Sequence, residues 1–176
     1  EEKEHGHSMA NGIVHVDYKD KHLNMIDTPG YPEFIGPSLK ALDAVETAAI
    51  VINAAAGIEP VARRMMDVAA GRKLCRIIVV NKIDRADAQP YVVLDHTFEL
   101  LMELGVDQDI DDIPYLFASS KDGYATHDPA IPTDSVESLL KLILEQVPGP
   151  EVSPDQPLQL LVTTLDWSDY VGRIAI

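Results

Sequence analysis

The sequence predicts an α/β fold, built on a doubly wound and mostly parallel sheet and followed by the start of an all-β domain. Short apolar runs rich in Val, Ile and Leu alternate with segments of helical periodicity, which is the pattern of β-α-β units. Two of these runs are continuously apolar, as in strands that are covered on both faces. A proline-rich stretch near residue 150 then separates this region from two short β-rich segments.

The first half of the chain predicts a hairpin, two buried strands and two helices. Residues 14–18 alternate apolar and polar side chains, and residues 23–27 return after a turn at Lys19-Asp20, which indicates an antiparallel pair. After a loop rich in Gly and Pro, a helix is expected over residues 38–46. Strands are expected at 47–54 and 76–81, with a helix between them over 60–72 that begins at a proline.

The second half predicts a helix over residues 90–104, a strand over 113–119 and a helix over 135–147 with Ser135 as its N-cap. Residues 1–147 would then form the α/β domain and residues 148–157 a proline-rich linker. Residues 158–176 would form the first strands of a β-barrel domain. Their strands are expected at 158–165 and 171–176, joined by a polar turn at 166–169.

Composition narrows the classes of function. The net charge of −15 argues against stand-alone binding of nucleic acid, which needs clustered Lys and Arg, but it allows docking onto the proteins of a ribonucleoprotein. The single cysteine, Cys75, excludes an intramolecular disulfide and is expected to be a small core residue. No apolar run approaches membrane-spanning length, so the cytoplasm is the expected location and no membrane partner is expected.

Three short motifs follow strand-like runs in the order of the chain: Asp-Thr-Pro-Gly at 27–30, Asn-Lys-Ile-Asp at 81–84 and Ser-Ser-Lys at 119–121. Open α/β sheets bind ligands at the carboxyl ends of their strands. Taken singly, the first motif is better explained by an ordinary turn, and the other two are weak patterns that also fit a polar loop and a Ser-rich turn. All three at strand ends, each followed by a helix, are an improbable coincidence, so together they indicate the guanine-nucleotide site of a P-loop GTPase.

The chemistry of the motifs divides into two tasks. Asp27 has a carboxylate that can hold Mg²⁺, and Gly30 can bring its backbone N–H close to a terminal phosphate. In the second motif, Asp84 can accept hydrogen bonds from the N1–H and the amine of guanine, which adenine does not offer. Asn81 can tie this loop to its neighbour, and Lys82 can lay its aliphatic stem along the base.

The third motif completes the base site. Ser119, Ser120 and Lys121 can present backbone N–H groups to the carbonyl oxygen of guanine. Such paired polar contacts discriminate between bases because a mismatched base leaves buried groups without partners.

These motifs give the chain a resemblance to translational GTPases of the elongation-factor class. The first half resembles elongation factor G in residues 4–8 and 27–34. From residue 81 onward the chain is similar to the TypA/BipA family, in residues 81–88, 117–123, 148–157 and 165–176. The resemblance implies a P-loop-NTPase-like G domain, binding of GTP and GDP with Mg²⁺, and hydrolysis of GTP on the ribosome.

The resemblance also shows departures. Ser8 stands where these factors carry a Mg²⁺-binding Thr, and Ser120 replaces an Ala. Tyr31 stands where they carry the His that orients the attacking water, and a phenol does not replace an imidazole in charge or reach. No G-x-x-x-x-G-K-[ST] motif occurs in the chain, so it is interpreted as a partial G domain that starts at the end of switch I. We therefore expect the 176 residues alone to bind GTP or GDP only weakly or not at all, and to be inactive.

Three functional hypotheses stay open at this point. The chain can be part of a GTP-binding translation factor whose parent hydrolyses GTP on the ribosome, a module that docks on the ribosome without hydrolysis, or a truncated reading frame without independent function.

Overall fold

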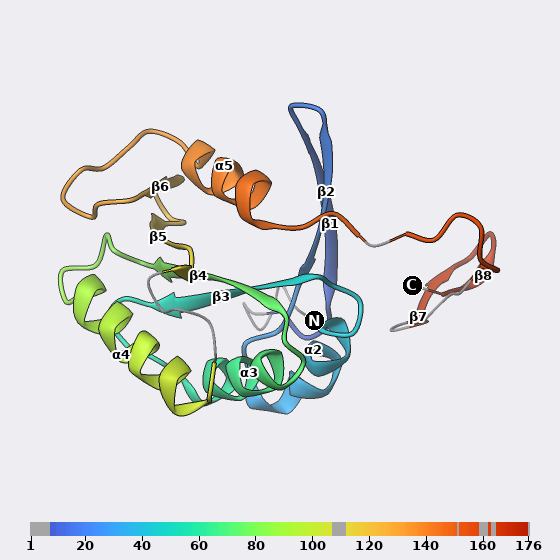
Figure 1. The fold of residues 1–176 in the computed structure, drawn as a ribbon, viewed down its shortest axis with the longest axis horizontal. Helices are drawn as coiled ribbons and strands as arrows, with labels where there is room; N and C mark the ends of the chain where they lie inside the picture. Colours follow the sequence, from blue (N-terminus) through green and yellow to red (C-terminus); the bar gives the residue numbers. More distant parts are fainter. Residues whose placement is uncertain (1–7, 107–111, 151, 159–161, 163–164, 176) are drawn as a thin grey trace. The chain divides into compact units, whose positions relative to one another are not determined.

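The structure is a computed structural model that describes residues 8–106, 112–150, 152–158, 162 and 165–175 (Figure 1). The chain divides into two units, one of Glu1–Glu46 with Gly149–Ile176 and the other of Thr47–Pro148. Parallel strands with helices on both faces make up the second unit, so the predicted α/β class is confirmed.

The sheet of the unit Thr47–Pro148 has four strands in the order of the chain: β3 (Thr47–Asn53), β4 (Cys75–Asn81), β5 (Tyr115–Ser119) and β6 (Tyr124–Thr126). The pairs β3–β4 and β4–β5 are parallel, whereas β5–β6 is antiparallel. The sequence did not predict β6, because its three residues are too few to show a strand period. Gly123, with φ of 76°, allows the tight return from β5 to β6.

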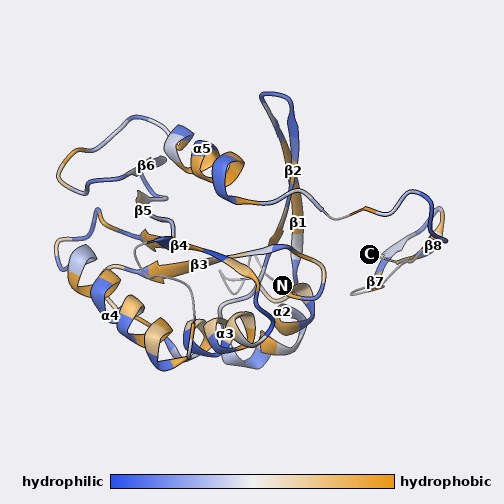
Figure 2. Ribbon diagram, viewed as in Figure 1, coloured by the Kyte–Doolittle hydropathy of each residue, from blue (hydrophilic) through white to orange (hydrophobic). Residues whose placement is uncertain are grey.

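Helices cover both faces of this sheet. Figure 1 shows α3 (Pro60–Gly71) and α4 (Pro90–Glu103) on one side and α5 (Glu137–Gln146) on the other. Ile77 and Val79 of β4 pack in one cluster with Leu142 of α5, and Phe117 of β5 meets the ring of Tyr91 of α4 edge-on at 5.4 Å. Figure 2 shows the matching concentration of apolar residues along β3 and β4. Burial of each such side chain contributes about 1.5–3 kcal/mol.

The other unit begins with the predicted hairpin, β1 (Gly12–Tyr18) paired antiparallel with β2 (Lys21–Asp27). Lys19 adopts a φ of 55° in the turn between them. A short 3₁₀ turn, η1 (Pro32–Phe34), leads into α2 (Ile35–Ala41). The helix predicted over 38–46 therefore begins and ends later in the chain than the observed helix α2 does. Pro37 lies in the first turn of α2, where a residue without an N–H is tolerated.

A second hairpin lies near the end of the chain, where β7 (Leu165–Ser168) pairs with β8 (Gly172–Ala175). The polar turn predicted at 166–169 is wrong, because Trp167 pairs with Arg173 within the ladder. The chain turns over residues 169–171, and Gly172 follows with φ of 78°. Most of the strand predicted over 158–165 lies outside the described residues. The domain limits at 147 and 157 stay a prediction.

Two local expectations need correction. Cys75 is exposed rather than part of the core, because it stands at the first position of β4, before the buried run of that strand. Helix α5 has Val136, not Ser135, at its N-cap, although the Ser135 hydroxyl oxygen accepts a hydrogen bond from the Glu137 N–H at 3.4 Å. Among the residues that the structure describes, no helix is long and apolar enough to span a membrane.

Candidate functional site

Two of the three motifs lie side by side at the carboxyl ends of neighbouring strands. β4 and β5 run parallel, with Asn81 in register with Ala118. The backbone N–H of Ile83 donates to the carbonyl oxygen of Ala118 at 3.3 Å. The loop that follows β4 and the loop that follows β5 are therefore adjacent from their first residues.

The side-chain oxygen of Asn81 joins these two loops. Asn81 Oδ1 accepts hydrogen bonds from the Lys82 N–H at 2.8 Å, the Ser120 N–H at 3.1 Å and the Ser120 hydroxyl at 3.0 Å. The first donor belongs to the same loop as Asn81, and the other two belong to the loop after β5. One acceptor atom thus fixes residues 39 positions apart in sequence.

A second link is made by Ser119, whose side chain is fully buried. Its hydroxyl oxygen lies 3.1 Å from Asp84 Oδ1 and 2.8 Å from Asp122 Oδ2. It also accepts a hydrogen bond from the Asp122 N–H at 3.2 Å. A hydroxyl has one proton, so Ser119 donates to one carboxylate at a time. Asp84, the residue expected to read the base, is exposed beside this buried anchor.

Asp122 is a member of this cluster that the sequence analysis missed. The only signal in the sequence was an Asp-Gly pair directly after the Ser-Ser-Lys motif, which is typical of any turn. The Gly123 N–H closes that turn on the carbonyl oxygen of Ser119 at 2.8 Å. The turn brings the Asp122 carboxylate back to the Ser119 hydroxyl.

Lys82 is exposed and has a φ of 64°, which costs a non-glycine residue about 1–2 kcal/mol. The bend is held by bonds on both sides of Lys82, since its N–H donates to Asn81 and its carbonyl oxygen accepts from the Arg85 N–H at 3.2 Å. Lys121 is also exposed. Both lysines are therefore open to solvent at the rim of the site.

Arg85 and Asp87 form a paired contact on the same loop, with Nε and Nη2 of Arg85 each 2.8 Å from a different oxygen of Asp87. The pairing raises the pKa of Arg85 above its ordinary value and lowers the pKa of Asp87. The charge of Arg85 is thereby compensated mainly by Asp87, and the Asp84 carboxylate also interacts electrostatically with Arg85.

The remaining site candidates belong to the other unit. Asp27 is the last residue of β2 and is exposed, and Ser8 is half-buried. A side chain at Gly30 would meet no atom within 4 Å, so packing within the structure does not require glycine there. Tyr31 is 49% exposed and precedes η1. The Pro29 carbonyl oxygen accepts a hydrogen bond from the buried Ser38 hydroxyl at 3.2 Å, which holds the segment between Asp27 and Tyr31.

The two residues predicted to hold Mg²⁺ carry oxygen donors that suit a hard cation. Ser8 and Asp27 offer a hydroxyl and a carboxylate oxygen, which are ligands that Mg²⁺ accepts, usually together with water and phosphate oxygens. Within the described part of the chain, no group of three or more His, Cys, Asp or Glu side chains is arranged to hold a metal ion.

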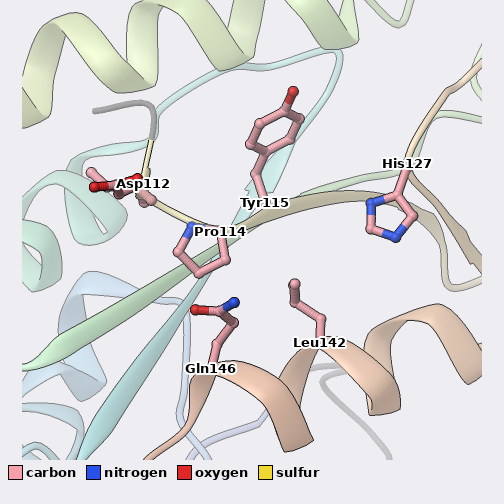
Figure 3. A pocket seen from close by; sticks show the side chains of 7 residues that line it. Asp112, Pro114, Tyr115, His127, Leu142 and Gln146 are labelled. Atoms are coloured by element: carbon pink, nitrogen blue, oxygen red, sulfur yellow. The ribbon is translucent and has the colours of Figure 1, made fainter. Parts of the chain in front are cut away.

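An open cavity of about 410 Å³ lies elsewhere in the unit Thr47–Pro148. It is found at the start of β5, where Pro114 and Tyr115 enter the strand, and it extends to His127 and to α5. Figure 3 shows Leu142 and Gln146 rising from α5 towards it. None of the motif residues lines this cavity, which is therefore distinct from the Asn81 and Ser119 cluster at the other end of β5.

Comparisons with known proteins agree with the fold and the motif order. Residues 1–149 match the family described as the elongation factor Tu GTP binding domain. The chain is 39% identical over 175 residues to the large ribosomal subunit assembly factor BipA of Synechocystis sp. and 35% identical to that of Bacillus subtilis. It is 33% identical to the putative elongation factor TypA-like SVR3 of Arabidopsis thaliana. These alignments cover 99% of this chain and 29%, 29% and 26% of the three relatives.

Solved structures show the same fold at low sequence identity. A bacterial selenocysteine-specific elongation factor, EF-Sec, superposes with a TM-score of 0.67 at 21% identity, over 82% of this chain and 23% of its own. The elongation factor SelB of Methanococcus maripaludis, in complex with the GTP analogue GPPNHP, gives a TM-score of 0.65 at 18% identity, over 79% and 28%. The matched span of 1–149 and the identity to BipA proteins show that this chain belongs to the family of elongation factor Tu-type GTP-binding domains.

Proposed function

We propose that this chain recognises the guanine base of GTP and GDP through the cluster at the ends of β4 and β5. The observation that carries the proposal is the link from Asn81 Oδ1 to both the N–H and the hydroxyl of Ser120. This link joins the loop of Asp84 to the loop of Ser120, which supports the proposal that both loops contact one base. Membership of a GTP-binding family supports this assignment.

The role proposed for each residue follows from the hydrogen-bond donors and acceptors along the edges of guanine. The Asp84 carboxylate accepts from N1–H and the exocyclic amine of guanine, while backbone N–H groups of Ser120 and Lys121 donate to O6. The stem of Lys82 covers one face of the ring. Adenine has no N1–H and no amine at C2, so it would leave Asp84 unsatisfied. The resulting preference is for 6-oxo-2-aminopurines.

Binding of phosphate and Mg²⁺ is proposed separately for Asp27, Gly30 and Ser8, in the other unit. Ser8 and Asp27 would hold Mg²⁺, which neutralises phosphate charge when it is bound. Gly30 would present its N–H to the terminal phosphate. Support comes from the exposed position of Asp27 at the end of β2 and from the hard oxygen donors of both ligands.

Binding of the base alone is expected to be weak. About three hydrogen bonds at roughly 1–3 kcal/mol each compete with an association cost on the order of 4–15 kcal/mol. The decisive test is a titration of the isotope-labelled 176-residue chain with GMP, GDP and AMP, followed by NMR. Shifts of residues 81–84 and 119–122 are expected with the guanine nucleotides only, at dissociation constants above micromolar. Equal responses to AMP would refute base recognition, and sub-micromolar binding of GDP would refute the weak-affinity estimate.

The whole protein is proposed to act on the large ribosomal subunit, as the printed names of its BipA relatives indicate for those proteins. This chain spans 29% of their length, so the test uses the full-length protein. Sedimentation with purified large subunits in the presence of a non-hydrolysable GTP analogue, but not GDP, is the expected result.

The side chain of Tyr31 favours a second candidate function, that of a factor that docks on the ribosome without efficient hydrolysis of GTP. The phenol is 49% exposed at the position where similar factors carry a His, and it does not share the charge and proton-transfer range of imidazole. Ribosome-stimulated release of phosphate by the full-length protein should therefore be slow and should increase in Tyr31→His. Rapid hydrolysis by the unaltered protein would exclude the non-hydrolysing candidate.

A further inference from the structure

We propose that the Ser120 hydroxyl is a positioning group of the guanine site, which takes over the hydrogen bond to Asn81 when the Ser120 N–H turns to the ligand. The inference rests on the proposed base recognition and adds a residue-specific device to it.

The structure shows an excess of donors at one atom. Asn81 Oδ1 lies within hydrogen-bond distance of the Lys82 N–H, the Ser120 N–H and the Ser120 hydroxyl, at 2.8, 3.1 and 3.0 Å. A carbonyl oxygen has two lone pairs, so two donors satisfy it. One of the two donors from Ser120 can therefore leave without breaking the contact between the loops.

The donor that can leave Asn81 is the backbone N–H of Ser120, which a 6-oxopurine needs as the hydrogen-bond donor to its O6 atom. The Ser120 N–H is assigned to guanine O6, and binding of the base would draw it away from Asn81. The hydroxyl is exposed and rotates freely about its Cβ–Oγ bond, so it can keep Asn81 Oδ1 occupied. Ser120→Ala removes the hydroxyl. When the backbone N–H of residue 120 turns to the base, no hydrogen bond from this residue to Asn81 would remain.

The tie between the loops, which is the hydrogen bonding of Ser120 to Asn81 Oδ1, matters because the two groups that would contact the base lie on different loops. Asp84 is on the Asn81 loop, and the Ser120 N–H is on the other loop. The two groups contact different atoms of one base, so their separation must be held within a fraction of an ångström for both to bond well. Loss of the tie in the bound state is therefore expected to weaken the contact with O6 more than the rest of the site.

The experiment compares GMP with 6-thio-GMP, which keeps N1–H and the 2-amine but replaces O6 by sulfur, a weak acceptor. Affinities are measured by NMR titration for the 176-residue chain and for Ser120→Ala, Ser120→Thr and the matched surface control Ser153→Ala. Ser120→Ala is expected to weaken GMP binding by about threefold to tenfold, the factor for one ordinary hydrogen bond. Its effect on 6-thio-GMP should be smaller, Ser120→Thr should restore GMP binding, and Ser153→Ala should change neither affinity.

The outcomes separate this inference from the proposed function. Selective GMP binding by the unaltered chain together with an unchanged affinity in Ser120→Ala would overturn the hydroxyl's role and leave base recognition intact. An equal loss for GMP and 6-thio-GMP would also overturn it, because a merely structural defect would affect both. No preference for GMP over AMP in the unaltered chain would refute both proposals. If Ser120→Ala lowers the folded fraction, Ser120→Cys serves as the second hydroxyl-free variant.

Discussion

The hydroxyl oxygen of Ser119 lies 3.1 Å from Oδ1 of Asp84, a residue 35 positions earlier in the chain. Ser119 is fully buried at the end of β5, whereas Asp84 is exposed on the loop after β4. A group that the core holds rigid thus steadies an exposed carboxylate. Such support is how a binding side chain on a loop reaches a defined position before the ligand arrives.

Ser119→Ala is expected to destabilise the fold by about 1–3 kcal/mol, the range for leaving buried hydrogen-bond partners unsatisfied. The Asp122 N–H would lose its acceptor, and the carboxylates of Asp84 and Asp122 would lose a donor. Urea denaturation followed by circular dichroism measures the change, with the exposed Ser153→Ala as control. Equal stabilities for the two variants would mean that the Ser119 contacts contribute nothing.

Asp84→Asn is expected to reverse the preference between guanine and xanthine. Asparagine keeps one acceptor oxygen for N1–H but replaces the other by an amide donor, which repels the 2-amine of guanine and complements the 2-oxo group of xanthine. Affinity for GMP should fall by about tenfold or more, because the 2-amine of guanine would lose its acceptor, while affinity for XMP should rise.

NMR titration of both nucleotides into the Asp84→Asn chain makes this measurement. Asp155→Asn, an exposed acid outside the motifs, is the control for the change in charge. A loss of GMP binding without any gain for XMP would leave Asp84 with a structural role only.

The sequence predicted the elements that have a clear period or a clear turn. The hairpin of β1 and β2 followed from alternation around Lys19-Asp20, and β4 from a continuous apolar run. Because β4 and β5 are parallel, with Asn81 in register with Ala118, the loops that carry the second and third motifs are neighbours. These features are local, and one strand or turn is enough to show them.

The parts that were missed depend on tertiary context. β6 is recognisable only once β5 exists to pair with it. The position of Asp122 depends on how the turn at Gly123 folds back, and the exposure of Cys75 depends on which end of β4 the neighbouring elements cover. No periodicity in the sequence carries this information.

Lys82→Gly is expected to have opposite effects on the stability of the fold and on the affinity for GMP. Lys82 has a φ of 64°, and glycine adopts this conformation without the side-chain clash, so the variant should be stabilised by up to about 1 kcal/mol after the entropy of the unfolded chain is counted. Binding of GMP should nevertheless weaken, because the stem that covers the base is gone.

Lys73→Gly is the matched control, since Lys73 has a φ of 56° after α3 and belongs to none of the motifs. It should gain stability to a similar extent and bind GMP as the unaltered chain does. Urea denaturation and NMR titration of both variants supply the two readouts. Unchanged GMP binding in Lys82→Gly would remove Lys82 from the site.

Tyr91→Phe tests the bridge between α4 and the loop after β6. The Tyr91 hydroxyl donates to Asp128 Oδ1 at 3.0 Å, and this hydrogen bond raises the pKa of Tyr91 above its ordinary value of 10.0. The protonated phenol is the form that folding favours, so the contribution to stability is fully present below the unfolded pKa and is lost as pH rises through the higher folded pKa.

The unaltered chain should therefore exceed Tyr91→Phe in stability by a constant amount between pH 7 and about 9. That margin should shrink as the pH passes above about 10. Denaturation curves across this range make the measurement. A margin that persists at high pH would mean that the hydrogen bond to Asp128 is not its cause. No margin at pH 7 would mean that Tyr91 acts only through its edge-on packing against Phe117, which phenylalanine preserves.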